Sequence, residues 1–155
     1  MVITTYNILK DLLSNSIIVL FNLVCNVTLS IANCSASSKD EDCEKAFDES
    51  DTAHWESDST KHVEWIKLNL DDGYYINDLQ VRQQSTYKAK SIMVVFSDGT
   101  EVNSTLEQQA NEWLSVELPA GIVSSYINIS TFRENRTHDQ MAVEQVRVGG
   151  CQPGT

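Results

Sequence analysis

The stretch AFDESDTAHWESDSTKHVEWIKLNL, residues 46–70, decides the fold class of this chain. It begins as an acid-rich segment around Trp55 and ends in a run whose apolar residues, Ile66, Leu68 and Leu70, occupy every second position. Successive side chains of a β-strand point to opposite faces, so this period of two is typical of a strand with one buried face. The stretch therefore predicts an acidic loop followed by a half-buried β-strand.

The same alternation recurs along the chain and is interrupted by turn residues. Between Ile76 and Leu79 the parity of the apolar residues shifts, which predicts a β-bulge at Asn77-Asp78. Asp72-Gly73 predicts a turn between two strands, and Asp98-Gly99 predicts a hairpin. Residues 91–96 are apolar on both parities, which predicts a strand covered on both faces. About eight strands with almost no helical periodicity predict an all-β, antiparallel jelly-roll β-sandwich.

The order of these segments resembles the factor V/VIII type C, or discoidin, domain of the galactose-binding-like superfamily. The acid loop with its two tryptophans carries the resemblance first, and four later segments continue it, SIMVVFSDGTEVNSTL at 91–106, EWLSVELP at 112–119, SSYINISTF at 124–132 and VEQVRVGGC at 143–151. It covers residues 26–151. The resemblance implies a galactose-binding-like sandwich that presents a ligand site on its loops.

Length and charge limit the classes of function. A chain of 155 residues is long enough for one domain with one core. Its formal net charge of -11 argues against binding to nucleic acid or to anionic lipid. It contains no GxSxG, HExxH or Walker sequence. Asp48 and Asp51 in the acid loop lack the features of a catalytic carboxylate pair. We therefore expect a binding domain and not an enzyme.

The first residues predict export. Lys10 precedes the apolar run IIVLFNLVC at 17–25, which is too short to span a bilayer and is typical of a secretory signal. We assign residues 1–25 to a signal peptide and 26–155 to the domain, which places the protein outside the cell, secreted or at the cell surface. Asp11 and Asn22 depart from the signal pattern, and an amphipathic helix or a wrongly assigned start is the alternative.

Glycosylation motifs and cysteines agree with an oxidising compartment. Five N-x-S/T motifs predict glycosylation at Asn26, Asn33, Asn103, Asn128 and Asn135.

The four cysteines allow more than one pairing. We predict a disulfide between Cys34 and Cys43, whose short intervening loop would tie the first strand to the acid loop. The rival, implied by the discoidin resemblance, joins Cys25 or Cys34 to Cys151 and so connects the two ends of the domain. Cleavage after Cys25 would leave an odd number of cysteines. Zinc is disfavoured because the chain has no CxxC pair and His54, His62 and His138 lack ligand spacing.

A structural calcium is expected at the acid loop. Counting back by two from Val148 and Val146 places Glu144 on the core-facing side, and a buried carboxylate needs a cation or several donors. The resemblance implies a calcium site there, and calcium takes about six to eight oxygen ligands. The positions that match the family's site are Ala46 through its carbonyl, Asp48, Asp51, Ala53 and Glu144. Two positions depart from the family pattern, since Glu49 replaces a glycine and Ala53 a threonine. The alternative is a solvated acidic loop.

We place the ligand site on loops at one end of the sandwich. These loops offer a ring for stacking and planar donors, which are the groups that bind sugars, in Tyr87, Arg133, Asn135, Arg136 and His138. An extracellular glycan or glycoprotein is therefore the expected partner, in cell adhesion or recognition. Two alternatives are a protein-binding adhesion module and docking to phosphatidylserine, which polar loops and the net charge disfavour.

Overall fold

The computed structural model describes residues 25, 27–50, 52–58, 63–83, 89, 91–105, 112–132 and 142–153. Within them the chain forms nine strands and one short 3-10 helix. Every paired strand is antiparallel, which confirms the predicted all-β class. The elements are β1 (Val27–Thr28), β2 (Ile31–Ala36), η1 (Asp40–Ala46), β3 (Trp55–Glu56), β4 (Val63–Gln83), β5 (Ser91–Phe96), β6 (Glu101–Thr105), β7 (Trp113–Ser115), β8 (Ile122–Phe132) and β9 (Ala142–Cys151).

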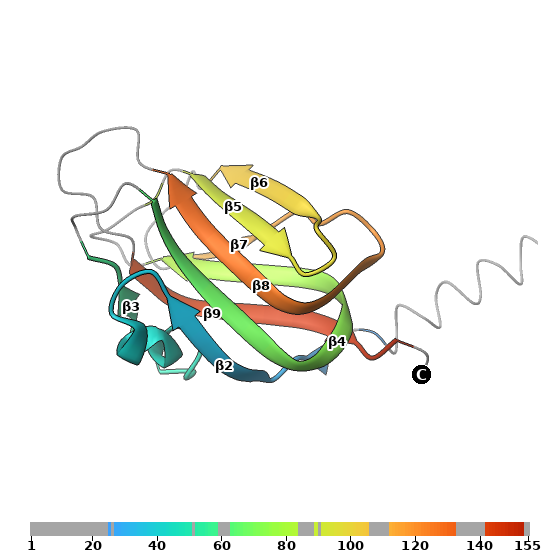
Figure 1. Cartoon of the computed structure of the whole chain (residues 1–155), viewed down its shortest axis with the longest axis horizontal. Coiled ribbons are helices and arrows are strands. Elements are labelled where there is room, and N and C mark those ends of the chain that lie inside the picture. The colour runs from blue at the N-terminus through green and yellow to red at the C-terminus, as the bar shows by residue number, and fades with distance from the viewer. Residues whose placement is uncertain are drawn as a thin grey trace, which may run out of the picture.

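The long strand β4 belongs to both layers of the sandwich (Figure 1). Its first part, as far as Asn69, pairs with β8, and β2 lies on its other side. Its last part pairs with β9 and β7. The register with β8 shifts between Asn69 and Tyr74, where the chain crosses from one layer to the other. The predicted turn at Asp72-Gly73 is therefore a bend within one continuous strand.

The strand order follows from this bend. The β8 layer runs β2–β4–β8–β5–β6, and the β9 layer contains β7, the last part of β4, β9, and the short strands β1 and β3. Apolar side chains from both layers meet in one core. Fully buried residues come from the alternating positions of each layer, among them Ile66, Leu68, Ile127 and Ile129 on one side and Leu79, Val81, Val146 and Val148 on the other.

Two irregularities interrupt the ladder between β4 and β9. The first is the predicted bulge, which is confirmed because Ile76 pairs with Gly150 and Asp78 with Gly149, leaving Asn77 as the extra residue. The second leaves Glu144 as the extra residue of β9. A β-bulge changes which face the following side chains occupy. Counting every second residue therefore no longer identifies the core-facing side chains beyond a bulge.

The β5–β6 hairpin agrees with its prediction in the turn and differs in burial. Gly99 occupies the turn with φ 86°, a left-handed conformation that favours glycine. Along β5 the alternate residues Ile92, Val94 and Phe96 are buried, and the residues between them are only half-buried. The prediction of a strand covered on both faces is therefore wrong, because only the face of β5 that points into the core is fully buried.

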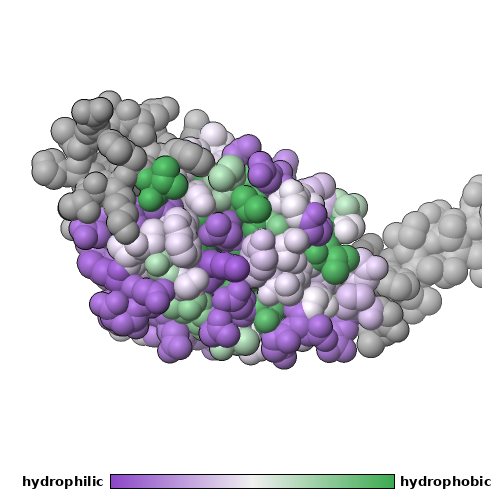
Figure 2. All heavy atoms as spheres, viewed as in Figure 1, coloured by the Kyte–Doolittle hydropathy of each residue, from purple (hydrophilic) through white to green (hydrophobic). Residues whose placement is uncertain are grey.

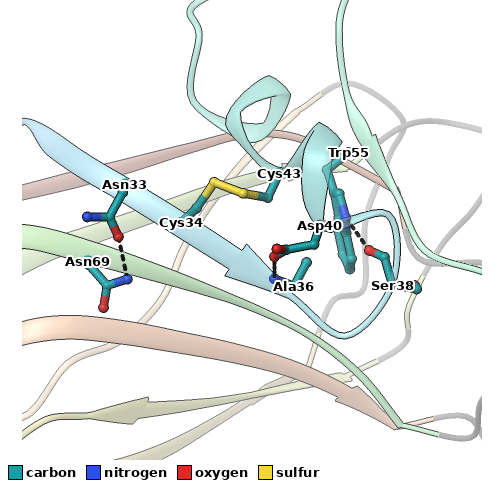
Figure 3. The surroundings of a disulfide bond; sticks show 8 residues. All are labelled: Asn33, Cys34, Ala36, Ser38, Asp40, Cys43, Trp55 and Asn69. Carbon is teal, nitrogen blue, oxygen red and sulfur yellow. Dashed lines mark hydrogen bonds between the residues drawn. A yellow bond between two sulfur atoms is a disulfide. The ribbon is translucent and has the colours of Figure 1, made fainter.

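Both disulfides are present in the structure. Cys34 and Cys43 are bonded with their Cα atoms 6.0 Å apart, which confirms the predicted pair (Figure 3). Cys25 and Cys151 are also bonded, with Cα atoms 4.7 Å apart. The two pairings that we treated as rivals therefore coexist. The boundary after Cys25 stays a prediction from the sequence, and the second bond attaches Cys25 to the last residue of β9.

The predicted glycosylation sites differ in their position on the sheets. Asn33 on β2 and Asn103 on β6 are exposed, and each lies on an edge strand of the β8 layer. Asn128 lies on β8 between β4 and β5 and is half-buried. Asn26 and Asn135 fall outside the described residues. No helix in the described part of the chain has the length and apolar character to cross a membrane.

Candidate functional site

Several strands end together at one end of the sandwich. The last residue of β4, Gln83, pairs with Val143 near the start of β9, and the last residue of β8, Phe132, pairs with Val63 at the start of β4. β5 begins beside Thr131, which pairs with Ile92. The strands that flank 84–90 and 133–141 therefore meet at this end, which we call the loop end. The predicted ligand residues Tyr87, Arg133, Asn135, Arg136 and His138 lie outside the described residues.

A buried amide anchors the chain where it leaves β4. Gln83 is only 4% exposed. Its Oε1 accepts a hydrogen bond from the Ala89 N–H at 2.9 Å, and its Nε2 donates to the Ala89 carbonyl at 3.4 Å. This reciprocal pair fixes Ala89 against the end of the core. The two described residues that flank the segment 84–88, Gln83 and Ala89, are thus bonded to each other.

A buried carboxylate, which sequence reasoning missed, lies at the same end. Glu64 is 1% exposed, and its Oε2 accepts hydrogen bonds from the hydroxyls of Ser37 and Ser38. Its Oε1 is buried without a hydrogen-bond partner among the described residues. The signal was present in the sequence, because counting back by two from Leu68 and Ile66 reaches Glu64.

The serines that hold Glu64 also connect the first strand to the tryptophan of the acid stretch. The Ser37 Oγ accepts from the Trp65 N–H at 2.9 Å, and the Ser38 carbonyl accepts from Trp55 Nε1 at 3.0 Å (Figure 3). Trp55 is completely buried. It therefore plugs the core beside the acid loop and is not available for stacking on a ligand.

The acid loop, residues 47–54, is closed by its own hydrogen bonds. Asp48 Oδ1 accepts from the Ser50 N–H at 2.9 Å, and Ser50 Oγ accepts from the Ala53 N–H at 3.3 Å. Glu49 has a left-handed φ of 60°, a conformation that favours glycine over other residues. Ala46, predicted as a calcium ligand through its carbonyl, is buried at the end of η1.

Glu144 does not face the acid loop as a free carboxylate. It is the bulged residue of β9, and its Oε2 lies 3.0 Å from the Arg82 Nε, with both side chains mostly buried. Val143, which is completely buried, occupies the core-facing position that the count by two gave to Glu144. The inward orientation predicted for Glu144 is therefore wrong, because the bulge reverses the parity of the strand.

The calcium site stays a prediction after this correction. Of its residues, Ala46 ends η1, Asp48 and Ala53 belong to the acid loop, Glu144 is paired with Arg82, and Asp51 lies outside the described residues. In the part of the chain that the structure describes, no three His, Cys, Asp or Glu side chains form a group that could hold a metal ion.

The acid loop contacts β9 through the neighbour of Glu144. Gln145 is 4% exposed, and its Nε2 donates a hydrogen bond to the Ser50 carbonyl at 3.1 Å. A groove of about 380 Å³ runs beside this contact. It is lined by residues of the segment before β2, of the loop and of β9, namely Thr28, Leu29, Ser30, Ile31, Phe47, Asp48, Glu49, Gln145, Val146, Arg147 and Val148.

A cationic cluster lies on the outer face of the β9 layer. The guanidinium of Arg147 stacks over the Trp113 ring at 4.1 Å from its centroid, and that of Arg82 lies at 5.2 Å. Both guanidinium groups thus lie near the ring, which is half-buried. This arrangement stabilises the sheet surface.

The visible surface is polar. Figure 2 shows the molecule from the side of the β8 layer, as in Figure 1, with hydrophilic residues spread over this side and apolar side chains only in small separate groups. Among the described residues, only Val27, Val63 and Tyr75 are large apolar side chains with high exposure. Val27 lies on β1, Val63 is the first residue of β4, and Tyr75 lies beyond the bend of β4. The described surface therefore presents no contiguous apolar patch of the kind that inserts into lipid.

Comparison with known proteins gives matches in structure only. No family model matches the sequence, and no curated protein matches it either. A CBM32 carbohydrate-binding module of AlyQ in complex with 4,5-unsaturated mannuronic acid has a TM-score of 0.67 at 19% identity, over 79% of this chain and 97% of that one. The family 32 module of C. perfringens NanJ in complex with galactose has a TM-score of 0.65 at 14% identity, over 79% of this chain and 99% of that one.

A third match comes from chitosan-binding module 1 of a chitosanase/glucanase from Paenibacillus sp. IK-5. Its TM-score is 0.62 at 21% identity, over 79% of this chain and 97% of that one. All three are complete modules that align over nearly their whole length, so the likeness concerns the entire sandwich. The chain has the galactose-binding-like β-sandwich fold of these modules, the fold that they share with discoidin domains.

Proposed function

We propose that this domain is a non-catalytic extracellular module that binds glycans at the loop end, within the discoidin group of the galactose-binding-like fold. The observation that carries the proposal is the match, over 79% of this chain and nearly all of each module, to modules in complex with 4,5-unsaturated mannuronic acid or galactose. The residue types in the loop segments supply the chemistry, since Tyr87 offers a ring face and Arg133 and Arg136 offer forked donors.

The described strand ends support a preorganised site. Gln83 holds Ala89 through two hydrogen bonds, and Glu64 holds Ser37 and Ser38 beneath the same end. Each of these anchors is nearly inaccessible to solvent. Binding loses less affinity when the site is already ordered, because fewer side chains and loops must be fixed on association. A rigid base of this kind favours recognition over chemistry that requires mobile groups.

The proposed location outside the cell is supported by the disulfide bonds and the glycosylation motifs. Two disulfides join Cys25 to Cys151 and Cys34 to Cys43. Such bonds persist in oxidising compartments and are rare in the cytosol. The exposed Asn33 and Asn103 lie in glycosylation motifs, which are used on the same export route. A role in adhesion or recognition at the cell surface is part of the proposal.

A glycan array tests the proposal directly. We expect the purified domain to bind a subset of acidic or galactose-type glycans. Tyr87→Ala and Arg136→Ala should each weaken binding at least about tenfold, because the loss of one contact in a sugar site costs about 1 to 3 kcal/mol. The melting temperature should change little, since neither substitution removes a residue of the described core.

Tyr75→Ala is the matched control for Tyr87→Ala. Tyr75 is exposed and pairs with Cys151 at the opposite end of the sandwich from the loops. Its loss should leave glycan binding unchanged. If the domain binds no glycan on a broad array, or if Tyr87→Ala and Tyr75→Ala bind equally well, a protein-binding adhesion module replaces the proposal. Sedimentation with phosphatidylserine vesicles tests the lipid alternative.

A further inference from the structure

The acid loop and β9 are joined by a neutral side chain. Gln145 is 4% exposed and donates its amide N–H to the Ser50 carbonyl at 3.1 Å. Ser50 lies at the centre of the loop, and its own N–H and hydroxyl are bonded to Asp48 and Ala53. A buried side-chain donor thus joins the loop to the strand.

The neighbouring carboxylate is used elsewhere. The resemblance places a calcium between the acid loop and an acid near the last strand, and Glu144 is the acid that matches. In the structure the bulge directs Glu144 to Arg82, at 3.0 Å. The side chain that meets the loop is therefore an amide, which brings an N–H donor where a calcium site requires an oxygen.

The described donors of the loop do not fit a calcium ion. The Ser50 carbonyl accepts an N–H, and one oxygen of Asp48 accepts the Ser50 N–H. Calcium takes about six to eight oxygen ligands, and no three His, Cys, Asp or Glu side chains gather in the described part of the chain to supply them. The amide of Gln145 satisfies the buried carbonyl without a charge, which removes the need for a cation at this contact.

We propose that Gln145 closes the acid loop in place of a metal ion, so that the stability of this domain does not depend on calcium. The same contact defines how a metal site would be created. Gln145→Glu exchanges the N–H donor for a second carboxylate oxygen beside the Ser50 carbonyl and Asp48. That variant should bind calcium, whereas the natural chain should not.

Thermal melting in calcium and in chelator tests both statements. We expect the natural domain to melt at the same temperature in the two buffers, because no ligand binds the folded state. Gln145→Glu should melt below the natural domain in chelator, where its carboxylate faces a carbonyl oxygen. Saturating calcium should raise the melting temperature of that variant by about 5 °C.

Two further variants control for the charge and for the lost bond. Gln80→Glu makes the same chemical change on β4, away from the acid loop, and should give no response to calcium. Gln145→Leu removes the donor without adding charge, so it should lower the melting temperature equally in both buffers.

A melting temperature of the natural domain that rises with calcium would overturn the proposal. A folded Gln145→Glu domain that ignores calcium would overturn it as well. If that variant fails to fold, titration calorimetry of the natural domain with calcium chloride decides, because heat of specific binding contradicts the proposal and its absence supports it.

Discussion

Gly150 shows how a single residue sets the distance between β4 and β9. A Cβ at this position would collide with the carbonyl oxygen of Tyr75 and lie 3.1 Å from the Leu29 Cδ1. The backbone of β4 cannot withdraw easily, because Ile76 pairs with Gly150 and is buried in the core. The chain therefore requires glycine here for space and not for a special φ.

Gly150→Ala should lower the free energy of unfolding by about 1 to 3 kcal/mol, the usual cost of overpacking a well-packed interior. Urea denaturation followed by tryptophan fluorescence measures it. Gly73→Ala is the matched control, because a Cβ at Gly73 meets no atom within 4 Å. Equal unfolding midpoints for the two variants would show that β4 and β9 separate without cost.

At the scale of an element, the β5–β6 hairpin depends on the turn residue Asp98. Asp98 Oδ1 accepts from the Thr100 N–H at 2.9 Å, and Oδ2 accepts from the Val123 N–H at 3.2 Å. The turn is thereby attached to β8 as well as to its own hairpin. Partial burial of Asp98 acts to raise its pKa, but these hydrogen bonds from Thr100 and Val123 outweigh burial and hold the pKa below its usual value.

The lowered pKa of Asp98 makes the hairpin sensitive to acid. A carboxyl group whose pKa is lower in the folded chain contributes stability above its unfolded pKa of about 3.9 and loses it as the pH falls through the folded pKa. We expect Asp98→Asn to reduce the free energy of unfolding at neutral pH and to flatten its fall below about pH 4. Urea titrations at several pH values measure both. A variant with the same acid profile as the natural domain would contradict this assignment.

The edge strands predict which glycosylation motifs carry sugar. Asn33 on β2 and Asn103 on β6 are exposed at the two edges of the β8 layer, where a glycan would also block pairing with another chain. Asn33 Oδ1 accepts from the Asn69 Nδ2 at 2.8 Å, and the Asn33 Nδ2, the atom to which an N-linked sugar is attached in a glycosylated asparagine, points away from Asn69 (Figure 3). Asn128 lies inside the layer with a buried Oδ1.

We therefore expect Asn33→Gln and Asn103→Gln each to remove one glycan from material secreted by a eukaryotic host. Asn128→Gln should leave the mass of the glycans unchanged. Intact-mass spectrometry before and after enzymatic deglycosylation distinguishes these results. A glycan at Asn128 with none at the edges would contradict the assignment.

For the whole molecule, the alternation of apolar and polar residues predicts the two layers. It does not predict which distant segments contact each other. Ile66 and Leu68 follow the period of two and are buried as expected. The spacing of Ile76 and Leu79 indicated the first bulge, and the same spacing between Val143 and Val146 marks the second, whose effect on Glu144 was missed. The bond from Cys25 to Cys151 spans 126 residues, and a pairing over such a distance depends on the completed fold.

The candidate site, like the fold, has one part that the sequence predicts and another that depends on the tertiary structure. The ring and the forked donors in the loop segments can be read from the sequence, but the base beneath them cannot. Gln83 and Glu64 become part of it only because β4 bends and returns, bringing its two ends together. The partner of Arg82 likewise depends on a register shift that no local pattern of residues specifies.

The central claim is that glycans bind at the loop end of this sandwich. Titration of the isotope-labelled domain with a glycan selected on the array, followed by amide chemical-shift changes in NMR, tests it most directly. We predict the largest changes in described residues at the strand ends, Gln83, Ala89 and Ala142, and none at the opposite bend around Tyr74 and Tyr75. Changes confined to that bend, or to the groove between the acid loop and β9, would contradict the account.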